Sequence, residues 1–135
     1  VSVGTMADAT RDYRVTSIRA AAVLTTSYVV GTRLTNDIWR YNQLIVLVQL
    51  TLGSLSSAEV RVEASLDDST WFKLPLTFPQ TQTQLIVNPG EYTMTSSDNY
   101  AIAIPIAYNF IRISAKGTGT VTDSTMTIDA ILAKI

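Results

Sequence analysis

The chain has 135 residues, 47% of them hydrophobic and 16% charged, and its 10 basic and 11 acidic residues give a net charge of −1. This length fits one domain, and the even charge balance argues against nucleic-acid binding, which needs a clustered basic excess. The sequence contains no cysteine and no histidine. Disulfides, thiolate metal sites and catalytic arrangements that need histidine are therefore excluded.

The N-terminal residues are small and without periodicity. We expect residues 1–12 to form an arm and residues 13–135 to form a single β-sandwich domain. In the first part of that domain, β-branched and aromatic residues favour strands as far as Val30, and Gly31 is expected to interrupt them. In an assembly, an arm of this kind often lies across a neighbouring subunit.

The strongest predicted strand covers residues 43–52. Its centre, residues 45–48 (IVLV), is apolar on both faces, which is typical of a central strand covered on both sides. After a loop, residues 59–65 (EVRVEAS) alternate between polar and apolar, which predicts a strand with one face in water. The two segments are predicted to pair as a hairpin.

Polar and proline-containing segments divide the middle of the chain. Residues 66–70 (LDDST) form a predicted turn, because Asp and Ser side chains can bond their own backbone. A strand is expected to resume at residues 71–74 and to end at Pro75. Shorter strands are expected at residues 85–87 and 91–95.

Three strands are predicted in the C-terminal third. Alternate residues of the segment 100–106 share an apolar face, and Pro105 indicates an edge strand or a bulge. Residues 110–116 and 124–134 are predicted to pair, with the glycine-containing link 117–123 as a hairpin turn. The predicted inward row of the last strand is Met126, Ile128, Ala130 and Leu132.

Eight or nine short strands, with turn signals about every 8–12 residues, predict an all-β antiparallel sandwich. No segment approaches the roughly 20 apolar residues of a membrane-spanning helix, so we expect no membrane partner. Because the charges are balanced, we also expect no nucleic-acid partner. The charged fraction also lies below the roughly 25% of typical globular chains. A lightly charged exterior is tolerated most easily when neighbouring subunits cover part of it.

Few residues of the chain are candidates for catalysis or for binding a metal or phosphate. Asp67 and Asp68 could serve a glycosidase or bind calcium, but capping of the predicted turn is the favoured explanation. The G-x-G at residues 117–119 lacks the lysine of a phosphate loop. We therefore expect no enzyme activity, no metal and no other cofactor.

The aromatic residues allow two interpretations, either a sugar-stacking platform or core and cross-strand packing, of which packing is favoured. The residues concerned are Trp39, Tyr41, Trp71, Phe72, Tyr92 and Tyr100. Trp39 and Tyr41 flank the charged Arg40, so one of these two rings is expected near solvent or an interface.

Two stretches resemble small virion proteins of tailed bacteriophages. The sequence YNQL at residues 41–44 leads to the alternating strand and then to SLDDSTW at residues 65–71. The segment FIRISAKGTGT, residues 110–120, is similar to the closing segment of those proteins. Asp68 stands where their turn has glycine. The same turn rhythm also occurs in discoidin-like and carbohydrate-binding sandwiches.

The resemblance implies a non-enzymatic virion structural protein on a jelly-roll-like sandwich. A capsid decoration (cement) protein that binds the major capsid lattice is the preferred role, because such proteins are often small sandwiches with arms. A head–tail connector or tail component is one alternative, and a carbohydrate- or receptor-binding module is another. The expected location is the virion.

The expected partners are further copies of the chain, with a trimer suggested by lattice symmetry, and the major capsid protein or another virion protein. A glycan ligand stays open. The residues expected to make assembly contacts are Val1, Val3, Met6, Trp39 and Tyr41.

Overall fold

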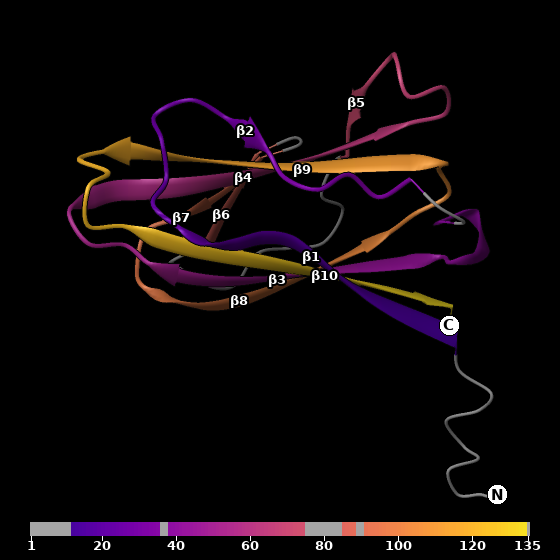
Figure 1. Ribbon diagram of the computed structural model, residues 1–135, viewed down its shortest axis with the longest axis horizontal. Helices are drawn as coiled ribbons and strands as arrows, with labels where there is room; N and C mark the ends of the chain where they lie inside the picture. Colours follow the sequence, from indigo (N-terminus) through magenta and orange to yellow (C-terminus); the bar gives the residue numbers. More distant parts are fainter. Residues whose placement is uncertain (1–11, 36–37, 75–84, 89–90, 135) are drawn as a thin grey trace, which may run out of the picture.

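The computed structural model describes residues 12–35, 38–74, 85–88 and 91–134, with the backbone alone described at residues 12 and 85–88. The described residues form two antiparallel sheets that pack face to face (Figure 1). Sheet A consists, in spatial order, of β1 (Asp12–Ala22), β10 (Thr125–Lys134), β3 (Gln43–Thr51) and β8 (Asp98–Pro105). Sheet B consists of β2 (Val29–Val30), β9 (Phe110–Gly119), β4 (Leu55–Ser65), β7 (Glu91–Met94) and β6 (Leu85–Asn88).

Two short elements complete the described structure. Strand β5 (Phe72–Lys73) pairs with β4, and the 3-10 helix η1 (Ile38–Arg40) precedes β3. No helix in the described part of the chain is long and apolar enough to cross a bilayer.

Successive strands alternate between the sheets, from β1 in sheet A through β2, β3 and β4, and again from β7 through β8, β9 and β10. This alternation is the strand order of a jelly roll. The predicted all-β, antiparallel, jelly-roll-like sandwich is therefore confirmed. The described residues contain ten labelled strands, two of which have only two residues.

Both predicted hairpins are wrong. Strand β3 pairs with β10 and β8, whereas β4 pairs with β9, β7 and β5, so β3 and β4 lie in different sheets. Strands β9 and β10 are separated in the same way. Alternation reveals which face of a strand is buried but does not reveal its neighbour. The links between these strands therefore cross from one sheet to the other.

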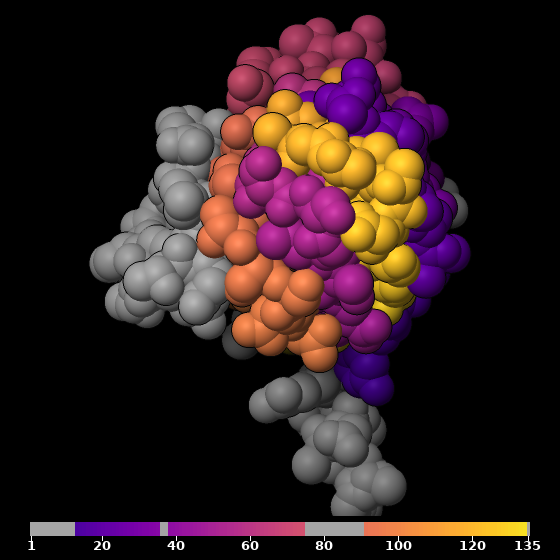
Figure 2. Space-filling model, turned by 90° about the vertical axis from the view of Figure 1, so that its left-hand side faces the viewer, coloured from indigo at the N-terminus to yellow at the C-terminus, as the bar shows by residue number. Residues whose placement is uncertain are grey.

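These crossing links meet at one end of the sandwich, which faces the viewer in Figure 2. The backbone N–H of Leu52 donates to Ser97 Oγ (2.7 Å), and the backbone N–H of Ser54 donates to Asp123 Oδ1 (2.8 Å). Two glycines have the positive φ that these links require, Gly53 at 60° and Gly119 at 111°. Side-chain hydrogen bonds thus connect three links, each of which joins sheet A to sheet B.

Two strand boundaries also differ from the prediction. Strand β1 is continuous to Ala22, but the residues after it form no strand until Val29. The strand predicted at residues 71–74 is reduced to β5. In both segments β-branched or aromatic residues favour extended backbone, but only the residues that find a neighbouring strand become part of a sheet.

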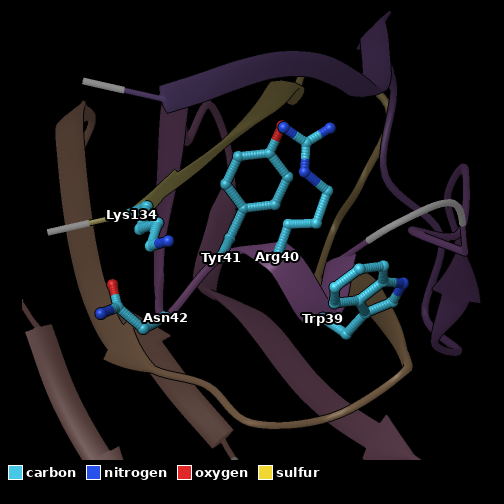
Figure 3. Close-up of a pocket in the computed structure, with 5 residues that line it drawn as sticks. All are labelled: Trp39, Arg40, Tyr41, Asn42 and Lys134. Carbon is cyan, nitrogen blue, oxygen red and sulfur yellow. The ribbon is translucent and has the colours of Figure 1, made fainter. Parts of the chain in front are cut away.

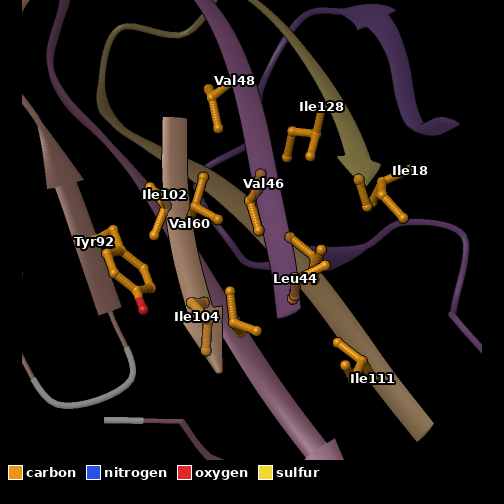
Figure 4. Close-up of a cluster of buried hydrophobic side chains, with 14 of the residues drawn as sticks. Ile18, Leu44, Val46, Val48, Val60, Tyr92, Ile102, Ile104, Ile111 and Ile128 are labelled. Carbon is orange, nitrogen blue, oxygen red and sulfur yellow. The ribbon is translucent and has the colours of Figure 1, made fainter. Parts of the chain in front are cut away.

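The core lies between the two sheets (Figure 4). The predicted inward row of the last strand is buried, and so is the row on β8 and just beyond it, Tyr100, Ile102, Ile104 and Ile106. Pro105 lies on β8, which is an edge strand as predicted. The prediction for β3 is half wrong, because Val46 and Val48 are buried whereas Ile45 and Leu47 are only partly buried.

Candidate functional site

A pocket of about 400 Å³ opens at the end of the sandwich where β1 begins and β10 ends (Figure 3). It is lined by Trp39, Arg40, Tyr41, Asn42 and Lys134, and we call it the Trp39 pocket. The first four of these residues come from η1 and the link to β3. Lys134 comes from the end of β10.

Backbone hydrogen bonds fix the rim of this pocket on the sandwich. The side chain of Ile38 is buried in the core, and the Tyr41 N–H donates to the Ile38 carbonyl (3.0 Å), which closes the single turn of η1. The Asn42 N–H donates to the Ala133 carbonyl (3.0 Å), and the Asn42 carbonyl accepts from the Ile106 N–H (3.1 Å). The pocket is therefore held by both central and edge strands of sheet A.

The two aromatic residues predicted to make contacts have different environments. Trp39 is 68% exposed, whereas Tyr41 is only 7% exposed. The Tyr41 ring lies near two guanidinium groups, 5.8 Å from Arg14 and 6.0 Å from Arg40 measured to the ring centroid. Trp39 thus exposes its indole ring, whereas the ring of Tyr41 is buried and lies near the two guanidinium groups.

The described lining of the pocket contains two cationic side chains, Arg40 and Lys134, and no acidic one. The pocket therefore combines an exposed indole with two cationic side chains and an amide. Sequence reasoning missed Asn42 and Lys134. Lys134 reaches the pocket only through the pairing of β10 with its neighbours, which no local pattern predicts.

The other predicted contact residues, Val1, Val3 and Met6, lie outside the described residues. Their point of attachment is nevertheless defined, because Asp12 at the start of β1 pairs with Lys134 at the end of β10. The predicted arm is therefore joined to the sandwich beside the Trp39 pocket.

The acidic turn caps the backbone, as predicted. Asp67 Oδ1 accepts from the backbone N–H groups of Ser69 (2.9 Å) and Thr70 (2.8 Å), and these bonds hold the pKa of Asp67 below its ordinary value. Asp68 has a φ of 60°, the left-handed conformation that glycine usually supplies, and it forms an ion pair with Arg33. The described residues contain no cluster of three or more acidic side chains that could hold a metal.

Three of the other aromatic residues named above pack within the fold, whereas Phe72 is 56% exposed. Tyr92 and Tyr100 are buried, and the Trp71 ring stacks against Arg112, whose guanidinium carbon lies 4.4 Å from the ring centroid. These positions favour packing over a ligand platform.

The outer face of sheet B carries a network of paired charges. The Tyr28 hydroxyl donates to Glu91 Oε2 (2.5 Å), and the Tyr28 ring lies under Arg61 (3.9 Å) and Lys116 (4.9 Å). Burial, followed by the bond to Glu91, raises the pKa of Tyr28. Because these groups contact one another, we interpret the network as stabilising the fold.

Comparison with known proteins found a similar structure but no similar sequence. No family of known proteins matches the chain, and no curated protein matches it either. The chain is similar to the crystal structure of SPBc2 prophage-derived protein YomS, with a TM-score of 0.58 and 17% sequence identity. The likeness covers 92% of this chain and 95% of that chain. At this identity the comparison establishes the fold that the two proteins share.

Proposed function

We propose that this chain is a non-enzymatic structural protein of a bacteriophage virion, and specifically a capsid decoration protein that docks on the major capsid lattice. Three observations support the proposal: the virion-like motifs at residues 41–71 and 110–120, the jelly-roll sandwich, and the fold shared with a prophage-derived protein.

The observation that carries the proposal is the exposure of Trp39. A tryptophan that is 68% exposed and lines one pocket with Arg40, on a backbone fixed by the sandwich, has the composition of an interface hot spot. The attachment point of residues 1–11 lies at the same end. In this proposal the arm and the Trp39 pocket contact one capsid subunit or two adjacent ones.

A head–tail connector or tail component would use the same chemistry. We prefer decoration because a compact sandwich with one short arm suits attachment to the surface of a preformed lattice. Copurification of the chain with whole particles, with isolated heads and with isolated tails will test whether it is a decoration protein, a head–tail connector or a tail component.

The test uses particles of the phage that encodes the chain, stripped of this protein, and measures binding by cosedimentation. Trp39→Ala and a chain lacking residues 1–11 should each weaken binding, the former about tenfold or more. Val23→Ala is the matched control, because Val23 is 48% exposed and follows β1 at its other end. Binding at a fixed stoichiometry supports the proposal. A folded chain that never binds particles contradicts it.

A carbohydrate- or receptor-binding module is the second candidate, because Trp39, Asn42 and two cations line one pocket. A glycan array should then detect binding that Trp39→Ala abolishes and Trp71→Ala retains. Particle binding without any glycan binding would favour decoration over this candidate.

A further inference from the structure

One row of the outer face of sheet A is apolar across all four strands. Register places Val15 of β1 beside Ile131 of β10, Ile131 beside Ile45 of β3, and Ile45 beside Ala103 of β8. These residues lie on the side of the sheet opposite the core, since their neighbours along each strand, such as Val46 and Leu132, are buried. They make one uninterrupted apolar row.

Two flanking rows extend this surface. One row is Tyr13, Ala133, Gln43 and Pro105, and the other is Ser17, Asp129, Leu47 and Ala101. Tyr13 is 62% exposed and Val15 is 58% exposed. We call these three rows the sheet A face, and Asp129 is its only charged residue.

The two outer faces of the sandwich therefore differ in kind. The outer face of sheet B carries Glu59, Arg61, Glu63, Arg112 and Lys116, paired with one another or with neighbouring residues. An antiparallel sheet with one face in water normally alternates between apolar and polar residues. The centre of strand β3 does not, because Ile45 and Leu47 are apolar on its outer side as well, whereas Gln43 and Gln49 on either side of them are polar. The centre of β3 therefore has the sequence of a strand covered on both sides.

We propose that the sheet A face is covered by the same face of a second copy of this chain. A nearly uncharged surface is compatible with itself, which a two-fold contact requires because each patch meets its own copy. Sheets pack face to face at about 10 Å, so the contact would extend the layered architecture that the molecule already has.

The whole outer face of sheet A, in which the uncharged row Thr127, Gln49 and Asn99 continues the sheet A face, is large enough for such a pair. Four strands about 4.8 Å apart, along a paired length of nine residues at about 3.3 Å each, cover roughly 600 Å² per copy. Two copies would bury about 1,200 Å², which is at the lower end of specific interfaces. Because the contact is two-fold, we infer a pair in place of the trimer suggested by lattice symmetry.

This pair is independent of the proposed capsid role. None of the residues that line the Trp39 pocket belongs to the sheet A face. Loss of pairing with particle binding retained, or the reverse, will therefore identify which of the two proposals fails.

The experiment is sedimentation velocity on the full chain between about 1 and about 100 µM. Wild-type protein should pair, and Ile45→Lys and Ile131→Lys should each raise the dissociation constant at least tenfold. Val30→Lys is the matched control, because Val30 is 44% exposed but lies on sheet B, and it should pair like wild type. Circular dichroism checks that each variant is folded.

A second measurement covers the case in which a lysine variant does not fold. The chain has no cysteine, so Leu47→Cys and Val30→Cys each introduce a unique thiol. Thiol labelling of Leu47→Cys should slow as protein concentration rises, while labelling of Val30→Cys should not change. A wild-type chain that stays monomeric throughout the range would overturn the proposal. So would oligomers that resist both lysine variants, or labelling of Leu47→Cys that does not change with protein concentration.

Discussion

The guanidinium carbon of Arg112 lies 4.4 Å from the centroid of the Trp71 ring. The Nε atom of the same arginine donates to Glu63 Oε1 (2.9 Å), and Glu63 is only 8% exposed. The indole therefore lies against an ion pair that is largely removed from water, where both the charge pairing and the cation–π contact are strengthened. Trp71, at the end of the β4–β5 link, thus stabilises the outer face of sheet B.

The two tryptophans should consequently differ in their effect on stability. Trp71→Ala should lower the free energy of unfolding by about 2 kcal/mol, since it removes a half-buried ring and exposes the ion pair. Trp39→Ala should change it by less than about 0.5 kcal/mol, because Trp39 is 68% exposed. Urea unfolding followed by circular dichroism measures both. Equal losses would mean that Trp39 also has a structural role.

The turn at residues 66–70 offers a second test, because Asp68 has a φ of 60°. Glycine adopts this conformation freely, whereas a β-branched residue is strained in it. Asp68→Val should therefore be less stable than Asp68→Gly by about 1–2 kcal/mol in urea unfolding. Both variants lose the ion pair with Arg33, so Arg33→Ala is the control for that contribution. Similar stabilities for the valine and glycine variants would argue that the backbone of this turn relaxes.

Local patterns in the sequence predicted which residues form the core more completely than they predicted which strands pair. The inward rows on β8 and β10 follow from two-residue periodicity alone, because that period decides which side chains share a face. The partners of β3 and β4 do not follow from it. Both strands look like members of one hairpin, and only the packing of two whole sheets separates them.

The candidate site was predictable to a similar extent. Trp39 and Tyr41 attract attention in the sequence because two aromatic residues flank an arginine. The sequence could not decide which ring is exposed, since that depends on Ile38 anchoring η1 in the core. Lys134 joins them from the far end of the chain through strand pairing, so no spacing rule could have indicated it.

Acid should destabilise the fold through two carboxylates. Asp67 accepts backbone bonds from Thr70 and Ser69, and Asp123 accepts the backbone N–H of Ser54, and these bonds lower the pKa of both groups. A carboxyl whose folded pKa lies below its unfolded value of about 4 contributes stability above that value. That contribution is lost as pH falls through the folded pKa.

The melting temperature should therefore fall as pH is lowered from about 5 to about 2, and the double variant Asp67→Asn with Asp123→Asn should show a shallower decline. Differential scanning calorimetry across this range measures both. Asp98→Asn serves as the control, because among the described residues the Asp98 carboxylate accepts only the neighbouring backbone N–H of Asn99. A double variant with the same acid slope as wild type would refute the assignment to these two groups.

The buried hydroxyl of Tyr92 leads to the last prediction. The Tyr92 side chain is 1% exposed, and its hydroxyl has no hydrogen-bond partner among the residues that the structure describes. Burial raises the pKa of Tyr92 to about 12, as expected for a phenol whose charged form is poorly solvated. A buried polar group without a partner costs about 1–3 kcal/mol, so Tyr92→Phe should raise the free energy of unfolding by about 1 kcal/mol.

The measurement is urea unfolding of Tyr92→Phe beside Tyr100→Phe as the matched control. The Tyr100 hydroxyl donates to the Ser96 carbonyl (2.8 Å), so its removal should instead cost about 1 kcal/mol. Opposite signs for the two substitutions are the expected result, because one hydroxyl is satisfied and the other is not. If Tyr92→Phe is also destabilising, its hydroxyl must be bonded in solution, and the position then belongs to the polar contacts that hold β7 in sheet B.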